Sequence, residues 1–429
     1  MATCFLPGLM GLLVCVGPAL ADEPRAQALL ADGTRLPNAG LESIGEAGQL
    51  LFSTNGRSRE IDSTQLVRWG WPSDPRRAPV IVSSAGELFP AREVTADENA
   101  VRAATRLLGA RRWPRDDVAG IAFTLSEQES EREKLFDWLA RVATESRAPG
   151  EASPRGNSRE SGGEKDQMAP SIESDILLLA NGDQLTGRLV EIGDRNVVFE
   201  TSAGRLEVAR QRVAAVRFAM TAAGRNAPLR GSQSKPPADE PDARQQQPNF
   251  HWAGLTDGSL WRIGSPARLA RVEARDVCYL QPIGGRVVYL SDLPVDDYRQ
   301  VPYLELSWPF ARDRSVSGGW LRASGKRYLK GLGLHSAARL TYRLRQPLMR
   351  FQAEVVMDDS AKRVGTVRIR VFVDGREQGE PRTVRAGGPT IPVDIALPEG
   401  ASRLDLIVEF GERGPVLDRV QWLDARLIR

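Results

Sequence analysis

The last third of the chain consists of short segments in which apolar and polar residues alternate. The segment 364–373 has an apolar residue at every second position, and the turn Asp374-Gly375 follows it. A period of two predicts a strand with one buried face. The same alternation occurs in the segments 339–344, 351–355, 392–397, 404–410 and 420–427. Short strands at this spacing predict a β-sandwich or jelly roll between residues 284 and 429.

A weaker pattern repeats four times in the first two thirds of the chain. Each copy has an Asn-Gly, Asp-Gly or Ala-Gly turn between two apolar runs, which is a hairpin signal, and alternating strands follow. The clearest copy runs from Leu178 to Phe218, and the others begin near Leu30, Ser84 and Leu255. Units of about 40 residues with four or five short strands predict small, bent β-barrels, similar to Sm-like barrels in pattern only.

One segment in this region is ambiguous, and one helix is predicted. The segment 101–108 fits a strand or a helix, and its correspondence with 197–203 in the clearest copy favours the strand. Further on, Ser126 and Glu129 have the spacing of a capping box. The apolar residues that then share one helical face are Leu135, Trp138, Leu139 and Val142. These spacings predict an amphipathic helix that packs on the barrels.

Two stretches contain almost no large apolar residue and therefore cannot build a core. They are residues 146–171 and 222–248, and we expect both to be disordered linkers. The predicted fold is mainly β. Its predicted parts are residues 22–145 with two barrel-like repeats and the helix, 172–221 with one repeat, 249–283 as a β-rich repeat, and 284–429 as the sandwich.

The first 21 residues are largely apolar and carry no charged side chain. They end in Ala19-Leu20-Ala21, and the acidic residues Asp22 and Glu23 follow, which predicts a cleaved signal peptide. An uncleaved membrane anchor and a lipoprotein signal at Cys15 remain alternatives. All three predict export, to a secreted or periplasmic place in the cell envelope. Once the leader is removed, Cys278 is the only cysteine, so no internal disulfide is expected.

Composition argues against several functional classes. The chain has 58 basic and 55 acidic residues, and the basic residues are scattered, so we expect no nucleic-acid partner. Its two histidines, His251 and His335, are too few for a histidine metal cluster. The sequence contains no nucleophile elbow or phosphate loop, and no pair of carboxylates stands out as a glycosidase would need. We therefore expect no enzyme and no cofactor, apart from a structural calcium ion as a possibility.

Several motifs of the last third, taken in order, carry a family resemblance. They are Gly331-Leu332-Gly333-Leu334-His335-Ser336, Leu340-Thr341-Tyr342-Arg343-Leu344, Asp358-Asp359, Val371-Phe372-Val373-Asp374-Gly375 and the run from Asp418 to Ala425. Together they resemble the NPCBM family of carbohydrate-binding modules, and the lead-in at 285–293 and 308–319 is similar to that of planctomycete-type envelope proteins. The resemblance implies a galactose-binding-like sandwich in an exported, non-catalytic protein that binds polysaccharide or envelope glycan.

Sugar recognition needs an aromatic face for the ring and fixed polar groups for the hydroxyls. The residues of these types near predicted strand ends are Trp320, His335, Arg339, Asp358 and Asp359. Each has a plainer interpretation: packing for the tryptophan, a structural hydrogen bond for the histidine, and a turn or calcium loop for the aspartate pair. If these plainer interpretations hold for all of the candidates, the chain is a structural or protein-interaction envelope protein whose sandwich has no sugar site.

Overall fold

A computed structural model of the chain describes residues 26–45, 48–145, 174–219, 250–269, 272–301, 308–345, 347–361, 364–412, 414 and 416–429. The predicted leader and both predicted linkers lie outside the described residues. The described chain is mainly β, as predicted, and forms several antiparallel sheets. None of the helices in these ranges is long and apolar enough to cross a membrane.

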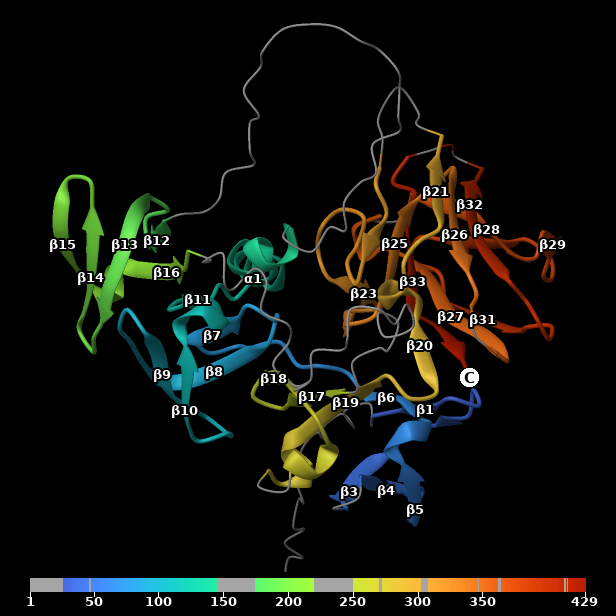
Figure 1. Cartoon of the computed structure of the whole chain (residues 1–429), viewed down its shortest axis with the longest axis horizontal. Coiled ribbons are helices and arrows are strands. Elements are labelled where there is room, and N and C mark those ends of the chain that lie inside the picture. Colours follow the sequence, from blue (N-terminus) through green and yellow to red (C-terminus); the bar gives the residue numbers. More distant parts are fainter. Residues whose placement is uncertain are drawn as a thin grey trace, which may run out of the picture.

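Four consecutive units, here called repeats 1 to 4, make up the first part of the fold (Figure 1). Repeat 1 contains β1 (Ala28–Leu30), β2 (Arg35–Leu36), β3 (Gly40–Ile44), β4 (Gln49–Thr54), β5 (Arg57–Asp62) and β6 (Leu66–Gly70). Repeat 2 contains β7 (Val80–Ser83), β8 (Leu88–Ala96), β9 (Ala100–Thr105), β10 (Ala110–Pro114) and β11 (Val118–Ala122). Repeat 3 contains β12 (Asp175–Leu179), β13 (Gln184–Ile192), β14 (Asn196–Thr201), β15 (Gly204–Ala209) and β16 (Val213–Arg217). Repeat 4 contains β17 (Phe250–Leu255), β18 (Leu260–Ile263) and β19 (Val277–Ile283).

The repeats share a local architecture that their common sequence pattern explains. In repeats 2 and 3 the long second strand, β8 or β13, pairs with the first strand at its beginning and with the third strand at its end. This bend produces the predicted barrel-like shape, and β9 confirms that residues 100–105 form a strand. A short 3-10 helix precedes the last strand of every repeat: η1 (Ser63–Gln65), η2 (Arg115–Asp117), η3 (Arg210–Arg212) and η6 (Ala274–Asp276).

The repeats join edge to edge into one 16-stranded sheet, here called the barrel platform. Three strands of repeat 1, β3, β4 and β5, form a separate sheet. The last strands pair antiparallel, β6 with β19 and β11 with β16, and β8 meets β18 between these two pairs. At Gly70 the strands come so close that a Cβ atom would lie 1.9 Å from the carbonyl oxygen of Cys278, and the φ of +68° also favours glycine. Edge-to-edge pairing covers strand edges that would otherwise be open to aggregation.

The single α-helix of the described residues, α1 (Glu129–Glu145), packs on β7 and β11 as predicted. Its buried side chains include Phe136 and Leu139. The predicted capping box is wrong, because the hydroxyl of Ser126 accepts from the amide of Gln128 at 3.1 Å and the helix begins only at Glu129. A few residues of extended chain therefore separate repeat 2 from the helix.

The C-terminal region is a β-sandwich, as the alternation predicted. Its first sheet has the order β22 (Ala311–Arg312), β25 (Gly331–His335), β33 (Arg419–Ile428), β27 (Arg350–Met357) and β31 (Ile391–Ala396), with β20 (Val287–Tyr289) also on β33. The second has the order β21 (Asp297–Gln300), β26 (Ala338–Arg343), β32 (Arg403–Phe410), β28 (Thr366–Val373) and β29 (Arg376–Glu377), with β30 (Arg382–Arg385) on β28. Trp422, Phe351 and Tyr342 are fully buried between them. A hairpin of β23 (Leu321–Ala323) and β24 (Lys326–Tyr328) lies outside both sheets.

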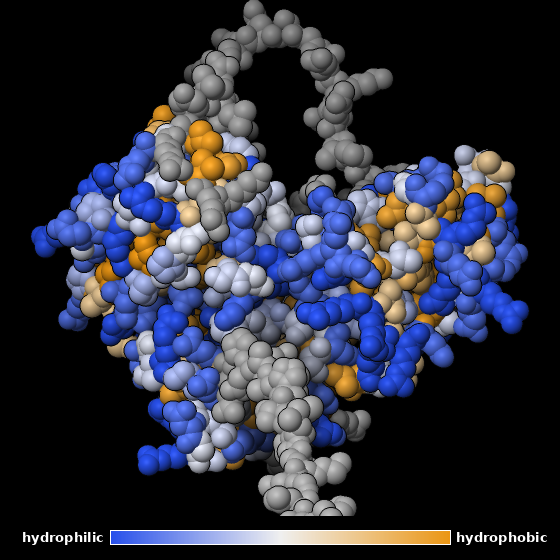
Figure 2. Space-filling model, turned by 180° about the vertical axis from the view of Figure 1, so that it is seen from behind, coloured by the Kyte–Doolittle hydropathy of each residue, from blue (hydrophilic) through white to orange (hydrophobic). Residues whose placement is uncertain are grey.

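The sandwich packs directly on the barrel platform (Figure 1). One buried cluster joins Leu29 and Val67 of repeat 1, Ile283 of repeat 4, and Tyr289 and Ile428 of the sandwich. The C-terminus consequently lies beside β1. Seen from behind, the surface is mostly hydrophilic, and its apolar side chains form small separate patches (Figure 2). That face of the molecule therefore shows no broad apolar area of the kind that marks large protein interfaces.

Candidate functional site

Three polar residues form a row at one end of the sandwich, here called the distal end. β25, β33 and β27 are neighbours in the first sheet; β25 and β27 end where β33 begins. His335 is paired with Arg419, and the amide of Asp358 donates to the carbonyl of Arg419 at 2.8 Å. The strand order alone therefore places these three residues side by side. The other end of β33, at Ile428, packs on the barrel platform.

An aromatic ring lies against this row. The indole of Trp308 stacks on the imidazole of His335 with ring centroids 5.0 Å apart and an angle of 6° between the planes. The guanidinium carbon of Arg419 is 5.8 Å from the centroid of the Trp308 ring. Two hydrogen bonds of 2.5 Å fix the backbone of Trp308: its amide donates to Gln300, and its carbonyl accepts from the hydroxyl of Tyr298. Trp308 is only half-buried.

Asp358 is a buried member of the row, and both of its carboxylate oxygens accept hydrogen bonds. Oδ1 accepts from the amide of Ser360 at 2.7 Å, and Oδ2 accepts from Gln421 at 2.6 Å and from the hydroxyl of Ser315. The hydroxyl of Ser360 in turn accepts from Nη1 of Arg419 at 3.2 Å. Asp358 thus ties three chain segments together and orients Arg419 through Ser360. Its position fits a structural carboxylate beneath the surface of the site.

A calcium ion at the aspartate pair does not fit this geometry. The side chains of Asp358 and Asp359 diverge, since Oδ2 of Asp359 accepts from the amide of Gly325 at 3.4 Å, in the turn of the β23–β24 hairpin. The oxygens of Asp358 face donors, whereas a cation would need them as free acceptors. Across the described ranges no group of three or more His, Cys, Asp or Glu residues is arranged to hold a metal ion.

The structure places two other candidate residues away from the row. Trp320 contacts α1: its ring stacks on Phe136 with centroids 6.0 Å apart, and the guanidinium carbon of Arg327 is 3.3 Å from its ring centroid. Arg339 is in β26 of the second sheet, where it forms an ion pair of 3.0 Å with Asp297. Of the five candidates, His335 and Asp358 belong to the row with Arg419, and Asp359 directly follows Asp358 at the same end of the sandwich. Contact of any of them with a sugar stays a prediction.

Asp418 and His335 are the groups of the distal end whose pKa values are shifted. Burial raises the pKa of Asp418 to about 6, although its Oδ1 accepts from the amide of Thr366 at 3.1 Å. Burial also lowers the pKa of His335, and the nearby charge of Arg419 adds to this effect. At neutral pH the imidazole is therefore uncharged, which suits its stacking on Trp308.

Neither Trp308 nor Arg419 is among the candidates that the sequence indicates. A signal for Arg419 was present, because it directly precedes the last predicted strand. In an antiparallel sheet, the start of one strand lies beside the ends of its neighbours. No comparable signal marks Trp308, whose position depends on the contacts of an irregular segment.

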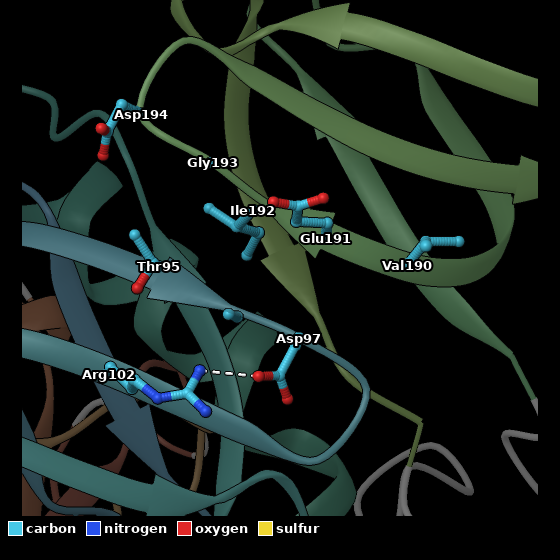
Figure 3. Close-up of a pocket in the computed structure, with 9 residues that line it drawn as sticks. Thr95, Asp97, Arg102, Val190, Glu191, Ile192, Gly193 and Asp194 are labelled. Carbon is cyan, nitrogen blue, oxygen red and sulfur yellow. Dashed lines mark hydrogen bonds and ion pairs between the residues drawn. The ribbon is translucent and has the colours of Figure 1, made fainter.

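A separate pocket lies between repeats 2 and 3, and residues of the barrel platform line it (Figure 3). It has a volume of about 420 Å³ and lies where the ends of β8 and β13 meet. The ion pair of Asp97 and Arg102, 2.6 Å long, is on one side, and Glu191 and Ile192 are on the other. Asp97 also accepts from the amides of its own turn. No aromatic residue lines this pocket, so it lacks the ring-stacking surface that sugar binding favours.

Comparisons with known proteins agree with the resemblance found in the sequence. Residues 286–428 match the NPCBM/NEW2 domain. The chain is similar to a structure of CBM51-2 and INT domains from Clostridium perfringens ZmpB, at 25% identity, 33% coverage of this chain, 31% of that chain and a TM-score of 0.30. It is also similar to CBM51 from Clostridium perfringens GH95 in complex with methyl-galactose. That match has 21% identity, covers 33% of this chain and 99% of that chain, and has a TM-score of 0.30.

The chain thus spans about a third of the ZmpB structure that it matches. No match was found among curated proteins. The family match begins at the strand β20 and ends in β33, so it coincides with the sandwich and leaves out the barrel platform. The sandwich of this chain therefore matches the NPCBM/NEW2 domain over nearly its whole length.

Proposed function

We propose that this chain is an exported, non-catalytic protein of the cell envelope that binds carbohydrate at the distal end of its sandwich. Trp308, His335 and Arg419 form the binding surface. The match to a family of carbohydrate-binding modules supports this proposal, and the half-buried indole beside a guanidinium is the observation that carries it. An indole face packs against the C–H face of a sugar ring, and guanidinium N–H groups donate to its hydroxyls.

The state of the nearby carboxylates supports binding without catalysis. A glycosidase needs two carboxyl groups that reach the glycosidic bond from either side. Asp358 is buried and held by three donors, and Asp418 is buried with its carboxyl bonded to the amide of Thr366. Neither presents a free oxygen at the surface, so these two carboxylates do not form an acid–nucleophile pair.

Export rests on the predicted leader and on cysteine usage. Beyond the leader the sequence has one cysteine, Cys278, which is half-buried and 3.5 Å from the hydroxyl of Ser73. Burial raises the pKa of its thiol, so the thiolate is disfavoured. Such a protein keeps its fold in an oxidising compartment without a disulfide. We therefore place this chain in the cell envelope, as an envelope protein of the planctomycete type.

Replacing Trp308 with alanine is the direct test. We expect Trp308→Ala to lower affinity for the bound glycan roughly tenfold or more, because the ring surface for the sugar is lost. Binding of the full chain is first mapped on a glycan array and then measured by affinity electrophoresis. The melting temperature should change little, since Trp308 is only half-buried.

Trp320→Ala is the matched control, because it removes the same side chain from the contact with α1. We expect this variant to bind the glycan normally and to melt at a lower temperature, owing to the loss of contacts with Phe136 and Arg327. Lost binding in Trp320→Ala with normal binding in Trp308→Ala would contradict the assignment of the site.

A structural role without a sugar site is the second candidate. The observation that favours it is the extensive contact between sandwich and platform, in which Arg322 alone forms ion pairs with Asp74, Glu129 and Glu133. A sandwich that is fixed to the platform by such contacts suits an envelope protein with a structural or protein-interaction role. Absence of binding to every glycan of the array would favour this role over carbohydrate binding.

A further inference from the structure

Arg419 is a charged residue of the distal end that has no counter-charge. Its Nη1 donates to the hydroxyl of Ser360 at 3.2 Å, and no carboxylate of the described residues lies within ion-pair distance. Three other arginines of the sandwich have ion-pair partners: Arg339 with Asp297, Arg385 with Glu412 and Arg403 with Asp405. Arg419 is half-buried, so solvent screens its charge less than that of a fully exposed side chain.

The acidic groups nearest in the fold are already engaged. Asp358 accepts three hydrogen bonds from neutral donors, and Glu412 is 2.9 Å from Arg385. Asp418, although adjacent in sequence, directs its Oδ1 to the amide of Thr366 in the second sheet. A guanidinium that carries one hydrogen bond keeps four N–H donors for a ligand.

We propose that the ligand of the distal end is an acidic glycan, whose sugar ring packs on Trp308 while its carboxylate binds Arg419. This inference rests on the proposed function and narrows it to uronic-acid-type sugars. The planar fork of a guanidinium matches a carboxylate, which it binds through two parallel hydrogen bonds. The 5.8 Å between the guanidinium carbon and the indole centroid allows one sugar residue to reach both groups.

The neutral imidazole of His335 fits this arrangement. It stacks on the Trp308 ring without adding a second charge, so Arg419 is the cation of this site that binds the carboxylate of the ligand. A neutral sugar would leave that charge without a partner, whereas a carboxylate would neutralise it. We expect a preference of roughly tenfold or more for the acid, the usual size of a charge-assisted hydrogen-bond contribution.

The test compares sugars that differ only in charge. Binding of the full chain to oligogalacturonides and to hyaluronan oligosaccharides is measured by calorimetry, each beside its carboxyl-methylated form. We expect one of the free acids to bind, its methyl ester to bind roughly tenfold more weakly, and its affinity to fall between about 50 and about 500 mM NaCl.

Two substitutions assign the effect to Arg419. Arg419→Gln should abolish the preference for the acid, while Arg419→Lys should keep part of it, because a lysine supplies charge without the fork. Arg385→Gln is the matched control: it removes a surface arginine of the same sandwich that already pairs with Glu412, and should leave affinity and preference unchanged.

The outcomes separate this inference from the proposed function. Equal binding of a free acid and its methyl ester, or tighter binding of a neutral glycan of the array, overturns the acidic ligand and leaves carbohydrate binding intact. If Arg419→Gln weakens acid and ester equally, Arg419 binds hydroxyls and the inference is also wrong. Absence of binding to any acidic or neutral glycan overturns both proposals.

Discussion

Asp424→Asn is expected to lower the free energy of unfolding of the chain by about 3 kcal/mol, because it leaves a buried arginine without its counter-charge. Oδ2 of Asp424 is 2.9 Å from Nε of Arg68, and both side chains are buried where the sandwich meets the barrel platform. The rest of the arginine is held by the carbonyl of Gly70 at 2.9 Å and by the rings of Trp71 and Tyr328. Only the aspartate supplies a direct ion pair.

Asparagine is the informative replacement, since it removes the charge and little else. Asp424 has a φ of +46°, a left-handed conformation that asparagine tolerates about as well as aspartate. Asparagine also keeps an oxygen for the hydrogen bond from Gln281, which is 3.0 Å from Oδ1. Backbone strain and lost volume therefore contribute little to the expected change.

Urea unfolding followed by tryptophan fluorescence measures the effect. Asp394→Asn is the matched control, because its ion pair with Arg350 is 2.8 Å long but solvent-exposed, and such pairs contribute less than about 1 kcal/mol. Equal losses in the two variants would contradict the prediction. Adding Arg68→Met to Asp424→Asn should recover part of the lost stability, since the buried guanidinium that lost its carboxylate is then removed as well.

This interface changes how the sandwich is to be studied. Besides the Arg68–Asp424 pair, a buried cluster of apolar residues from repeats 1 and 4 and the sandwich crosses it. Cutting the chain before residue 284 would expose both to water. Binding assays therefore belong on the full chain, where the distal end keeps its supporting contacts.

The sandwich was predictable because its information is local. Alternation with a period of two located β26, β27, β28, β31, β32 and β33 to within about two residues. Trp422, in the last of these strands, is fully buried. Once those strands are antiparallel neighbours, the row of His335, Arg419 and Asp358 follows from where they begin and end.

The features that could not be predicted from the sequence depend on contacts between distant residues, which leave no local pattern. Arg68 and Asp424 are 356 residues apart, and neither position differs from an ordinary charged residue in the sequence. The pairing of β11 with β16 joins repeats separated by the helix and a predicted linker. The sequence could not show that Trp320 packs against α1, because only folding brings Phe136 against its ring. Trp320 was therefore a candidate for ligand binding.

The second large effect concerns Asp418. Because the pKa of Asp418 is about 6 in the folded chain and 3.8 is its ordinary value, the folded state holds this proton more tightly than the unfolded state. Its contribution to stability is complete below about pH 4 and is lost as the pH rises through about 6. At neutral pH the chain therefore carries the cost of a buried carboxylate, on the order of 2 kcal/mol.

Asp418→Asn should remove this cost, and so stabilise the chain by about 2 kcal/mol at pH 7.5 while leaving it nearly unchanged at pH 4. The free energy of unfolding in urea, measured between about pH 4 and pH 8, gives the profile for both proteins. Asp374→Asn is a control of opposite sign, because hydrogen bonds from Ser402 lower the pKa of that carboxyl and its loss should cost stability at neutral pH. Parallel profiles for the wild-type chain and Asp418→Asn would show that Asp418 stays ionised at no cost. A difference that grows with pH through about 6 would establish that Asp418 is a buried, titrating carboxyl.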